Sequence, residues 1–106
     1  MVGCSAPRTP EEVAKEFIEA LMEGKCQKAL TLTREMSRAE SIVEEFKNQG
    51  CVPYILDYKS VYCTTQGETA YCQCYQSEKT ATKSVAYDLI KVDGAWWIDN
   101  FEELDY

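Results

Sequence analysis

The chain has 106 residues, which is room for one domain, and 45% of them are apolar, as in ordinary globular domains that bury one core. Eleven basic and eighteen acidic side chains give a net charge of −7, and such a surface repels phosphate backbones, so we expect no nucleic-acid partner. The sequence contains no histidine, which excludes a Ser-His-Asp triad, a Cys-His pair and a His-ligated zinc site. Any catalysis would therefore depend on carboxylates, Tyr, Lys or Cys.

Residues 1–8 are predicted to form a flexible tether before a single domain over residues 9–106. Within the tether, Val2-Gly3-Cys4 resembles the processing site of bacterial lipoproteins, in which a small residue directly precedes the cysteine that is diacylated. We therefore expect Cys4 to be the site of lipid attachment and the membrane to be contacted only through that anchor. This hypothesis implies a signal peptide upstream of Met1. The alternative is an ordinary surface cysteine near a frayed end.

Three helices are predicted in the N-terminal half. Thr9-Pro10-Glu11-Glu12 begins the first helix with a capping residue, a proline suited to the first turn and two acids at the positive end of the helix dipole, and Gly24 ends it. A short second helix covers residues 25–33. The third begins at the capping-box pattern Ser37-Arg38-Ala39-Glu40 and ends at Gly50. Apolar residues recur at helical spacing in all three, which indicates that these faces pack in the core.

Four strands are predicted after residue 52, over residues 54–65, 69–77, 84–92 and 95–101, where Tyr, Val, Ile and Thr become frequent. The first of these is long enough to need a bend or a bulge. Asp93-Gly94 is a strong two-residue hairpin signal between the last two strands. The predicted fold class is therefore α+β, with three N-terminal helices packed on a four-stranded antiparallel sheet.

The six cysteines are the feature that points most directly to a compartment, because this density in a short chain is typical of an oxidising environment. We therefore expect an extracytoplasmic protein, either secreted or held in the cell envelope. If Cys4 carries lipid, five cysteines remain for two disulfides and one free thiol. If Cys4 does not, three disulfides are possible.

The pairing of the cysteines is constrained by strand geometry. Cys72 and Cys74 lie two residues apart in one strand, so both point to the same face and each needs a different partner. If residues 67–68 form a two-residue loop, Cys63 lies directly opposite Cys72 at a spacing that suits a disulfide. A three-residue loop would break this register. With Cys63 and Cys72 joined, Cys74 would pair with one of the two other candidates, Cys26 or Cys51.

A zinc site is the alternative interpretation of these cysteines. Its ligands would be four thiolates, from Cys51, Cys63, Cys72 and Cys74. Zinc sites usually take ligand pairs from turns, and C-x-C inside a strand is a poor match, so we expect no metal. The sequence contains no C-x-x-C redox motif, and we expect no cofactor.

One pair of carboxylates is a candidate for catalysis. With Asp93-Gly94 as a two-residue turn, Asp88 falls opposite Asp99. In a pocket, two facing carboxylates can supply an acid or base with a raised pKa, and Tyr87 is the candidate partner. On an open sheet face the same residues are two solvated aspartates, and the sequence favours this second interpretation.

Four stretches carry a resemblance to a known family. They are the first helix over residues 9–21, the segment Gly24-Lys25-Cys26-Gln27-Lys28-Ala29, the turn Gly67-Glu68-Thr69-Ala70, and residues 91–99, which end in Asp-Gly-Ala-Trp-Trp-Ile-Asp. Together they make nearly the whole chain similar to small bacterial lipoproteins of the nuclear transport factor two-like superfamily. All four motifs are structural. Some enzymes on this fold use a pocket aspartate, as isomerases and cyclases do, but no such catalytic pattern can be carried onto this chain.

The resemblance implies a cone in which the helices pack into the concave face of a curved sheet, with a pocket at the open end. It also implies which strand residues face the helices, namely Ala70, Cys72, Cys74, Trp96 and Ile98. This chain has cysteines where the family usually has an aromatic residue (Cys26) or branched aliphatic residues (Cys72 and Cys74). Disulfides between helix and sheet would narrow or close the pocket.

These observations favour a non-catalytic, extracytoplasmic binding or interaction module for an unidentified protein or small ligand. Its contact surface would be the exposed sheet face with Tyr62, Tyr71 and Tyr75, because aromatic residues on open sheets often mark interfaces. The same face would serve a homodimer. The alternative is a small-molecule enzyme of the isomerase or cyclase type that uses Asp88 or Asp99 with Tyr87.

Overall fold

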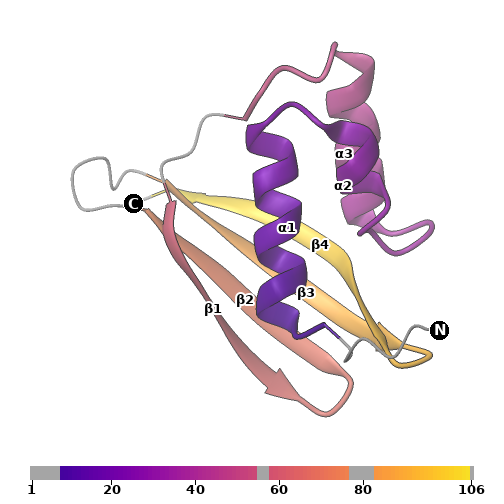
Figure 1. Ribbon diagram of the computed structural model, residues 1–106, viewed down its shortest axis with the longest axis vertical. Coiled ribbons are helices and arrows are strands. Elements are labelled where there is room, and N and C mark those ends of the chain that lie inside the picture. The colour runs from indigo at the N-terminus through magenta and orange to yellow at the C-terminus, as the bar shows by residue number, and fades with distance from the viewer. Residues whose placement is uncertain (1–7, 55–57, 77–82, 106) are drawn as a thin grey trace, which may run out of the picture.

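Residues 8–54, 58–76 and 83–105 are described by the computed structural model. Three helices, α1 (Pro10–Met22), α2 (Cys26–Leu30) and α3 (Arg38–Asn48), precede four strands, β1 (Tyr58–Gln66), β2 (Thr69–Gln76), β3 (Lys83–Val92) and β4 (Ala95–Asp105). The strands form one antiparallel sheet in chain order (Figure 1). The predicted α+β fold class is confirmed. None of the helices in these ranges is long and apolar enough to cross a membrane.

The helices begin at the side-chain caps that the sequence indicates. Thr9 Oγ1 accepts a hydrogen bond from the Glu12 N–H at 3.2 Å, and Glu12 Oε1 accepts one from the Thr9 N–H at 2.8 Å, which completes the capping box of α1. At α3, Ser37 Oγ accepts from the Glu40 N–H at 3.1 Å, but the Glu40 carboxylate accepts from the Met36 N–H instead of closing the box. The predicted cap of α3 is therefore only half formed.

The second helix is shorter than the sequence predicts. It ends at Leu30, and the chain then runs beside β4, where Thr33 forms a parallel bridge with Ile98. Ile98 donates its N–H to the Leu32 carbonyl at 2.9 Å, and Arg34 donates its N–H to the Ile98 carbonyl at 2.8 Å. These bonds satisfy backbone groups at the edge of the sheet, and this tertiary contact overrides the local helical pattern.

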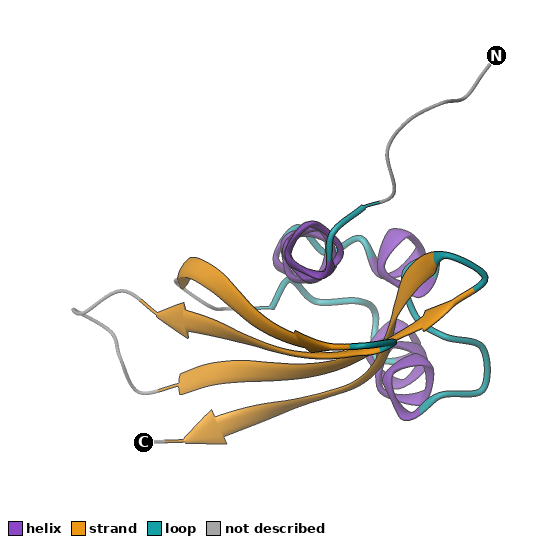
Figure 2. Cartoon of the chain, turned by 90° about the horizontal axis from the view of Figure 1, so that it is seen from below, coloured by secondary structure: helices purple, strands orange, loops and turns teal. Residues whose placement is uncertain are grey.

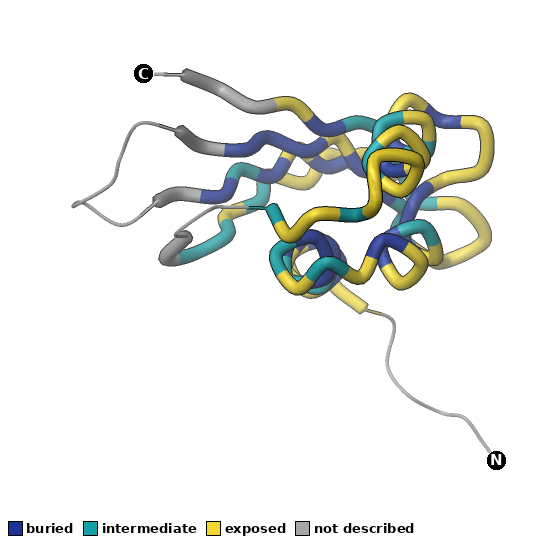
Figure 3. Tube along the Cα trace, turned by 90° about the horizontal axis from the view of Figure 1, so that it is seen from above, coloured by how far each residue is buried: buried dark blue, intermediate teal, exposed yellow. Residues whose placement is uncertain are grey.

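The core lies between the helices and one face of the sheet. Figures 1 and 2 show α1 lying across that face, with α2 and α3 gathered beside β4, and Figure 3 shows the buried residues concentrated where these layers meet. Phe17 of α1 contacts Tyr87 and Phe101 edge to face, with ring centroids 5.9 and 5.2 Å apart. The residues that the resemblance places toward the helices do lie there, since four are buried and the fifth, Trp96, is partly buried against the core: Ala70, Cys72, Cys74, Ile98 and Trp96.

The register of β4 departs from the prediction at a single bulge. The two-residue hairpin at Asp93-Gly94 forms as expected, with Val92 opposite Ala95. Further along, Leu89 pairs with Ile98, but Asp88 pairs with Asn100, so Asp99 is an extra residue in β4. The predicted pairing of Asp88 with Asp99 is therefore wrong. The bulge allows Ile98 and Phe101, which are three residues apart, to be buried on the same face.

The strand ends also differ from the prediction in places. β4 continues to Asp105, because its pairing with β3 extends to Lys83, whereas the predicted strand ends at residue 101. β1 begins at Tyr58 and not at residue 54, since Tyr54 instead donates its N–H to the Leu21 carbonyl at 2.9 Å. The bend or bulge expected in β1 is present between Tyr58 and Ser60.

Two disulfides are present in the part of the chain that the structure describes, and one of them is the predicted pair. Cys63 and Cys72 lie opposite each other in β1 and β2 with their Cα atoms 4.0 Å apart, because residues 67–68 form a two-residue loop. The second disulfide joins Cys26 to Cys51, and Cys74 is a buried free thiol. The prediction that Cys74 pairs with Cys26 or Cys51 is wrong, as is the expectation of a disulfide between helix and sheet.

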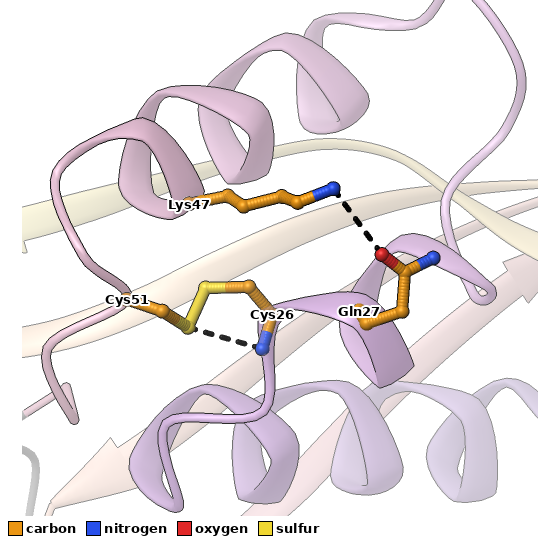
Figure 4. The surroundings of a disulfide bond; sticks show 4 residues. All are labelled: Cys26, Gln27, Lys47 and Cys51. Atoms are coloured by element: carbon orange, nitrogen blue, oxygen red, sulfur yellow. Dashed lines mark hydrogen bonds between the residues drawn. A yellow bond between two sulfur atoms is a disulfide. The ribbon is translucent and has the colours of Figure 1, made fainter.

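The disulfide between Cys26 and Cys51 connects the start of α2 to the segment that follows α3 (Figure 4). Lys25, the N-cap residue of α2, makes no side-chain capping hydrogen bond. Instead, Cys51 Sγ accepts a hydrogen bond from the Cys26 N–H at 3.0 Å and so satisfies a backbone donor of the first turn. Lys47 Nζ binds Gln27 Oε1 at 3.3 Å beside it. Gly24 has a φ of 71°, and a Cβ there would lie 3.2 Å from the Cys51 carbonyl, which explains a glycine at this position.

Candidate functional site

The interior of the cone is packed with aromatic rings where the resemblance implies a pocket. In addition to the contacts of Phe17, the Phe46 ring lies 6.2 Å from both Tyr54 and Phe101, and Tyr87 lies 6.3 Å from Phe101. Phe17, Tyr87 and Phe101 are buried almost completely. These rings occupy the space between helices and sheet in which a ligand would have to bind.

The three residues proposed for catalysis are not brought together. Tyr87 is fully buried in the core, and Asp88, its neighbour in β3, is exposed on the opposite face because successive strand residues point to opposite sides. Asp99 accepts a hydrogen bond from Arg34 at 3.3 Å, and both side chains are substantially exposed. The two carboxylates lie near the same surface hollow, but the tyrosine does not contribute to it.

The exposed side of the sheet carries the residues proposed as a contact surface. We call it the outer face and define it by the strand residues that alternate with the core positions: Tyr62 and Thr64 of β1, Tyr71 and Gln73 of β2, Asp88 and Ile90 of β3, and Trp97 of β4. Tyr62 is 62% exposed and Tyr71 is 46% exposed. The side chain of Tyr75, the third tyrosine of the prediction, lies outside the described residues, as does Cys4.

A first hollow of about 620 Å³, here called the sheet hollow, crosses the outer face. Tyr71 and Asp88, which are paired across β2 and β3, lie in its wall together with Ile90. Asp99 lines it from β4, and the rest of the wall comes from the polar residues Thr64, Gln66 and Thr69 and the apolar residues Ala70 and Leu89. Its charged residues are both carboxylates.

A second hollow, also of about 620 Å³, lies between the β3–β4 hairpin and the loop after α2, and we call it the hairpin hollow. Its apolar wall comes from Leu30, Val92, Ala95 and Trp97. The charged residues in its wall are Arg34, Glu35, Glu40 and Asp93. The two sides of this hollow are joined by the backbone hydrogen bonds between Arg34, Leu32 and Ile98.

The two hollows are neighbours. Ile90, in the wall of the sheet hollow, is the register partner of Trp97, in the wall of the hairpin hollow. Asp99 and Arg34, which form the ion pair at 3.3 Å, likewise belong to one hollow each. The two hollows therefore adjoin each other at these two residue pairs.

The cysteine sulfur atoms of the described residues do not gather into a reactive or metal-binding centre. Of the four cysteines proposed as zinc ligands, Cys51, Cys63 and Cys72 are in disulfides, which leaves Cys74 as a thiol. Burial raises the pKa of the Cys74 thiol to about 12, so the nucleophilic thiolate is scarce at neutral pH. In the part of the chain that the structure describes, no group of three or more metal-ligating side chains gathers.

Sequence reasoning missed the hairpin hollow. Neither Trp97 nor Arg34 is predicted from the sequence to line a binding site. The signal available for Trp97 was the two-residue turn, which fixes Trp97 on the face opposite Trp96. No signal places Arg34 beside Asp99, because that contact depends on the bridge between Thr33 and Ile98.

A three-helix layer on a curved, open antiparallel sheet is the architecture of nuclear transport factor two-like proteins, and solved structures bear this out. The chain is similar to an NTF-2-like protein of unknown function from Shewanella oneidensis MR-1, with 12% identity, a TM-score of 0.60, and coverage of 89% of this chain and 94% of that one. It is also similar to Bd1075 of Bdellovibrio bacteriovorus, with 13% identity and a TM-score of 0.63.

The second similarity covers 90% of this chain but only 38% of Bd1075, so the fold forms one part of that longer protein. No family model and no curated protein matches the sequence. The chain therefore has the nuclear transport factor two-like fold, as the sequence resemblance implied, and at these identities the likeness establishes the fold alone.

Proposed function

We propose that this chain is a non-catalytic binding module that works outside the cytoplasm and uses the outer face of its sheet as the contact surface. The observation that carries the proposal is the contrast between the two faces. The inner face is packed with rings, whereas the outer face presents Tyr62, Tyr71 and the two hollows to solvent. Exposed aromatic residues beside shallow depressions are typical of protein interfaces.

The compartment is inferred from the cysteines. Two disulfides are compatible with an oxidising environment, since such bonds are rare in reducing compartments.

The positions of the candidate carboxylates support binding over catalysis, because these carboxylates lie on the surface and not in an enclosed pocket.

A lipid anchor at Cys4 is a further part of the proposal and rests on the Val2-Gly3-Cys4 motif alone. A tether before α1 would hold the domain at the membrane surface while leaving the outer face accessible. Export of the chain behind a lipoprotein signal peptide tests this point by intact mass. A diacylglyceryl mass on the wild type that is lost in Cys4→Ser supports the anchor, and an unmodified wild type contradicts it.

Site-specific photo-crosslinking tests the contact surface. A photo-reactive amino acid is placed at position 62 or 71 of the exported chain, and at position 52 as the control, because Val52 is 75% exposed but lies outside the strands. Discrete adducts from positions 62 and 71 and none from position 52 support the proposal. Equal labelling at all three positions, or none at 62 and 71, would contradict it. The adduct mass separates a homodimer from a different partner.

A further inference from the structure

The wall of the hairpin hollow is suited to receive an apolar side chain. Trp97 and Leu30 face it from opposite elements, and Val92, which is 38% exposed, completes the apolar side with Ala95. Tryptophan is among the residue types that contribute most to binding when a partner covers them. Because the bonds of Ile98 with Leu32 and Arg34 hold the loop against β4, the hollow is preformed and little ordering entropy opposes binding.

The charges around the hollow select the kind of partner. Glu35, Glu40 and Asp93 lie in its wall, and Asp88 and Asp99 lie in the adjoining sheet hollow. Among the described residues that line the two hollows, Arg34 is the one cationic side chain, and Asp99 neutralises it at 3.3 Å. The local field is therefore negative, in a chain whose net charge is −7. A cationic ligand is attracted, and anionic lipid or nucleic acid is repelled.

The two hollows adjoin each other, because Ile90 pairs with Trp97 and Arg34 pairs with Asp99 across their walls. A ligand that fills both must be longer than one side chain and must present an apolar group and cationic groups in sequence. An extended polypeptide has this form, because its side chains follow one another at regular spacing along the backbone.

From these three observations we propose that the hairpin hollow and the sheet hollow together bind a basic segment of a partner protein. One apolar side chain of that segment packs against Trp97. A neighbouring Lys or Arg side chain pairs with Glu35 and Asp93, and a second lies between Asp88 and the ring of Tyr71. The inference rests on the proposed function and makes it specific, since it names the part of the outer face that binds and the chemistry that it binds.

Selection from a library of random peptides displayed on phage tests the inference on the full, oxidised chain. The expected result is enrichment of peptides with Lys or Arg on either side of a large apolar residue. Affinity of a selected peptide, measured by fluorescence anisotropy, is expected to fall several-fold when NaCl is raised from about 50 to about 300 mM, because the charge pairs are exposed to solvent.

Variants locate the site. Trp97→Ala is expected to weaken the selected peptide about tenfold or more, as for an interface hot spot. Since Trp97 is half buried, a second variant that leaves the core untouched is needed, and Glu35→Gln with Asp93→Asn removes two exposed charges while keeping a residue suited to the turn. This double variant is expected to bind several-fold more weakly and with a smaller salt dependence. Val52→Ser is the matched control and is expected to bind as the wild type does.

Three results would overturn the inference. They are a library that yields no binder, a consensus that is acidic or without charge, and binding that survives both Trp97→Ala and the charge variant. None of these contradicts the proposed function, because crosslinking from positions 62 and 71 reports contact with the outer face whatever its chemistry. Conversely, peptide binding to the chain without crosslinking from positions 62 and 71 would support the two hollows as a binding site. It would contradict the proposal that Tyr62 is part of the natural interface.

Discussion

The two faces of the same strands differ in what they offer a ligand. On β2 and β3, Cys72 and Tyr87 lie in the core, and their immediate neighbours Tyr71 and Asp88 lie on the outer face. One step along the backbone therefore moves a side chain from a packed interior to a solvated surface. A pocket enzyme needs polar groups inside the cone, whereas this chain places its candidate carboxylates outside. Polar side chains near one another in sequence do not make a site unless the pleat directs them to the same side.

The largest effect is expected from a change to the inner face. Phe17→Ala removes a ring that contacts Tyr87 and Phe101 and leaves a cavity, so we expect the free energy of unfolding to fall by about 3–5 kcal/mol. This free energy is measured by urea denaturation with the disulfides intact. A loss below about 1 kcal/mol would show that the interior is loosely packed and has room for a ligand.

The two disulfides are expected to contribute unequally. Loop-closure entropy gives roughly 3.5 kcal/mol for Cys26–Cys51, which spans 25 residues, and roughly 2.6 kcal/mol for Cys63–Cys72, which spans 9. The comparison uses the double variants Cys26→Ala with Cys51→Ala and Cys63→Ala with Cys72→Ala in thermal unfolding. Because Cys26 also donates its N–H to Cys51 Sγ, loss of the first disulfide removes a helix cap as well. The reverse order of stability would contradict this account.

The buried thiol of Cys74 makes the stability of the inner face depend on pH. Burial raises the pKa of Cys74 from 9.0 to about 12, so the folded state holds its proton more tightly than the unfolded state. The resulting stability is complete below pH 9 and is lost as the pH rises from 9 toward 12. Between pH 8 and pH 10 the free energy of unfolding, measured by urea denaturation, is expected to fall by about 1 kcal/mol more for the wild type than for Cys74→Ala. If the free energies of unfolding of the wild type and of Cys74→Ala change in parallel with pH, Cys74 is in contact with water.

The smallest effect on stability is expected at the outer face. Tyr62→Ser changes a side chain that is 62% exposed, and we expect the free energy of unfolding to change by about 0.5 kcal/mol or less. The same variant is expected to lose the crosslinked or bound partner. Urea denaturation and binding are measured on one preparation. A large fall in the free energy of unfolding would mean that Tyr62 stabilises the fold, and would contradict a role for Tyr62 in partner binding alone.

Much of the fold is predictable from local patterns. The cap at Thr9, the hairpin at Asp93-Gly94 and the pairing of Cys63 with Cys72 all depend on residues close in sequence, and all are present. Two of the failures involve distant residues. The early end of α2 depends on the bridge to Ile98, and the partner of Cys26 depends on where α3 returns the chain. Local propensity contains no information on either contact.

The candidate site was predictable in part, for a similar reason. Strand alternation alone exposes Tyr62 and Tyr71. The position of Asp99 was not correctly predicted. A signal for it is present in the sequence, since Ile98 and Phe101 are both apolar and lie three residues apart. Strict alternation cannot bury both, and a bulge is the usual solution. The hairpin hollow needs a loop and a hairpin that are far apart in sequence, so only the structure reveals it.

The central claim is that the interior is closed and that recognition takes place on the outer face. Titration of the isotope-labelled chain with water-soluble fragments, followed by chemical shifts, tests it most directly, because every residue reports separately. We predict that fragment binding shifts the signals of Tyr71 and Trp97 and leaves those of Phe17 and Tyr87 unchanged. A fragment that shifts Phe17 and Tyr87 without unfolding the chain would show an accessible interior pocket and would contradict the account.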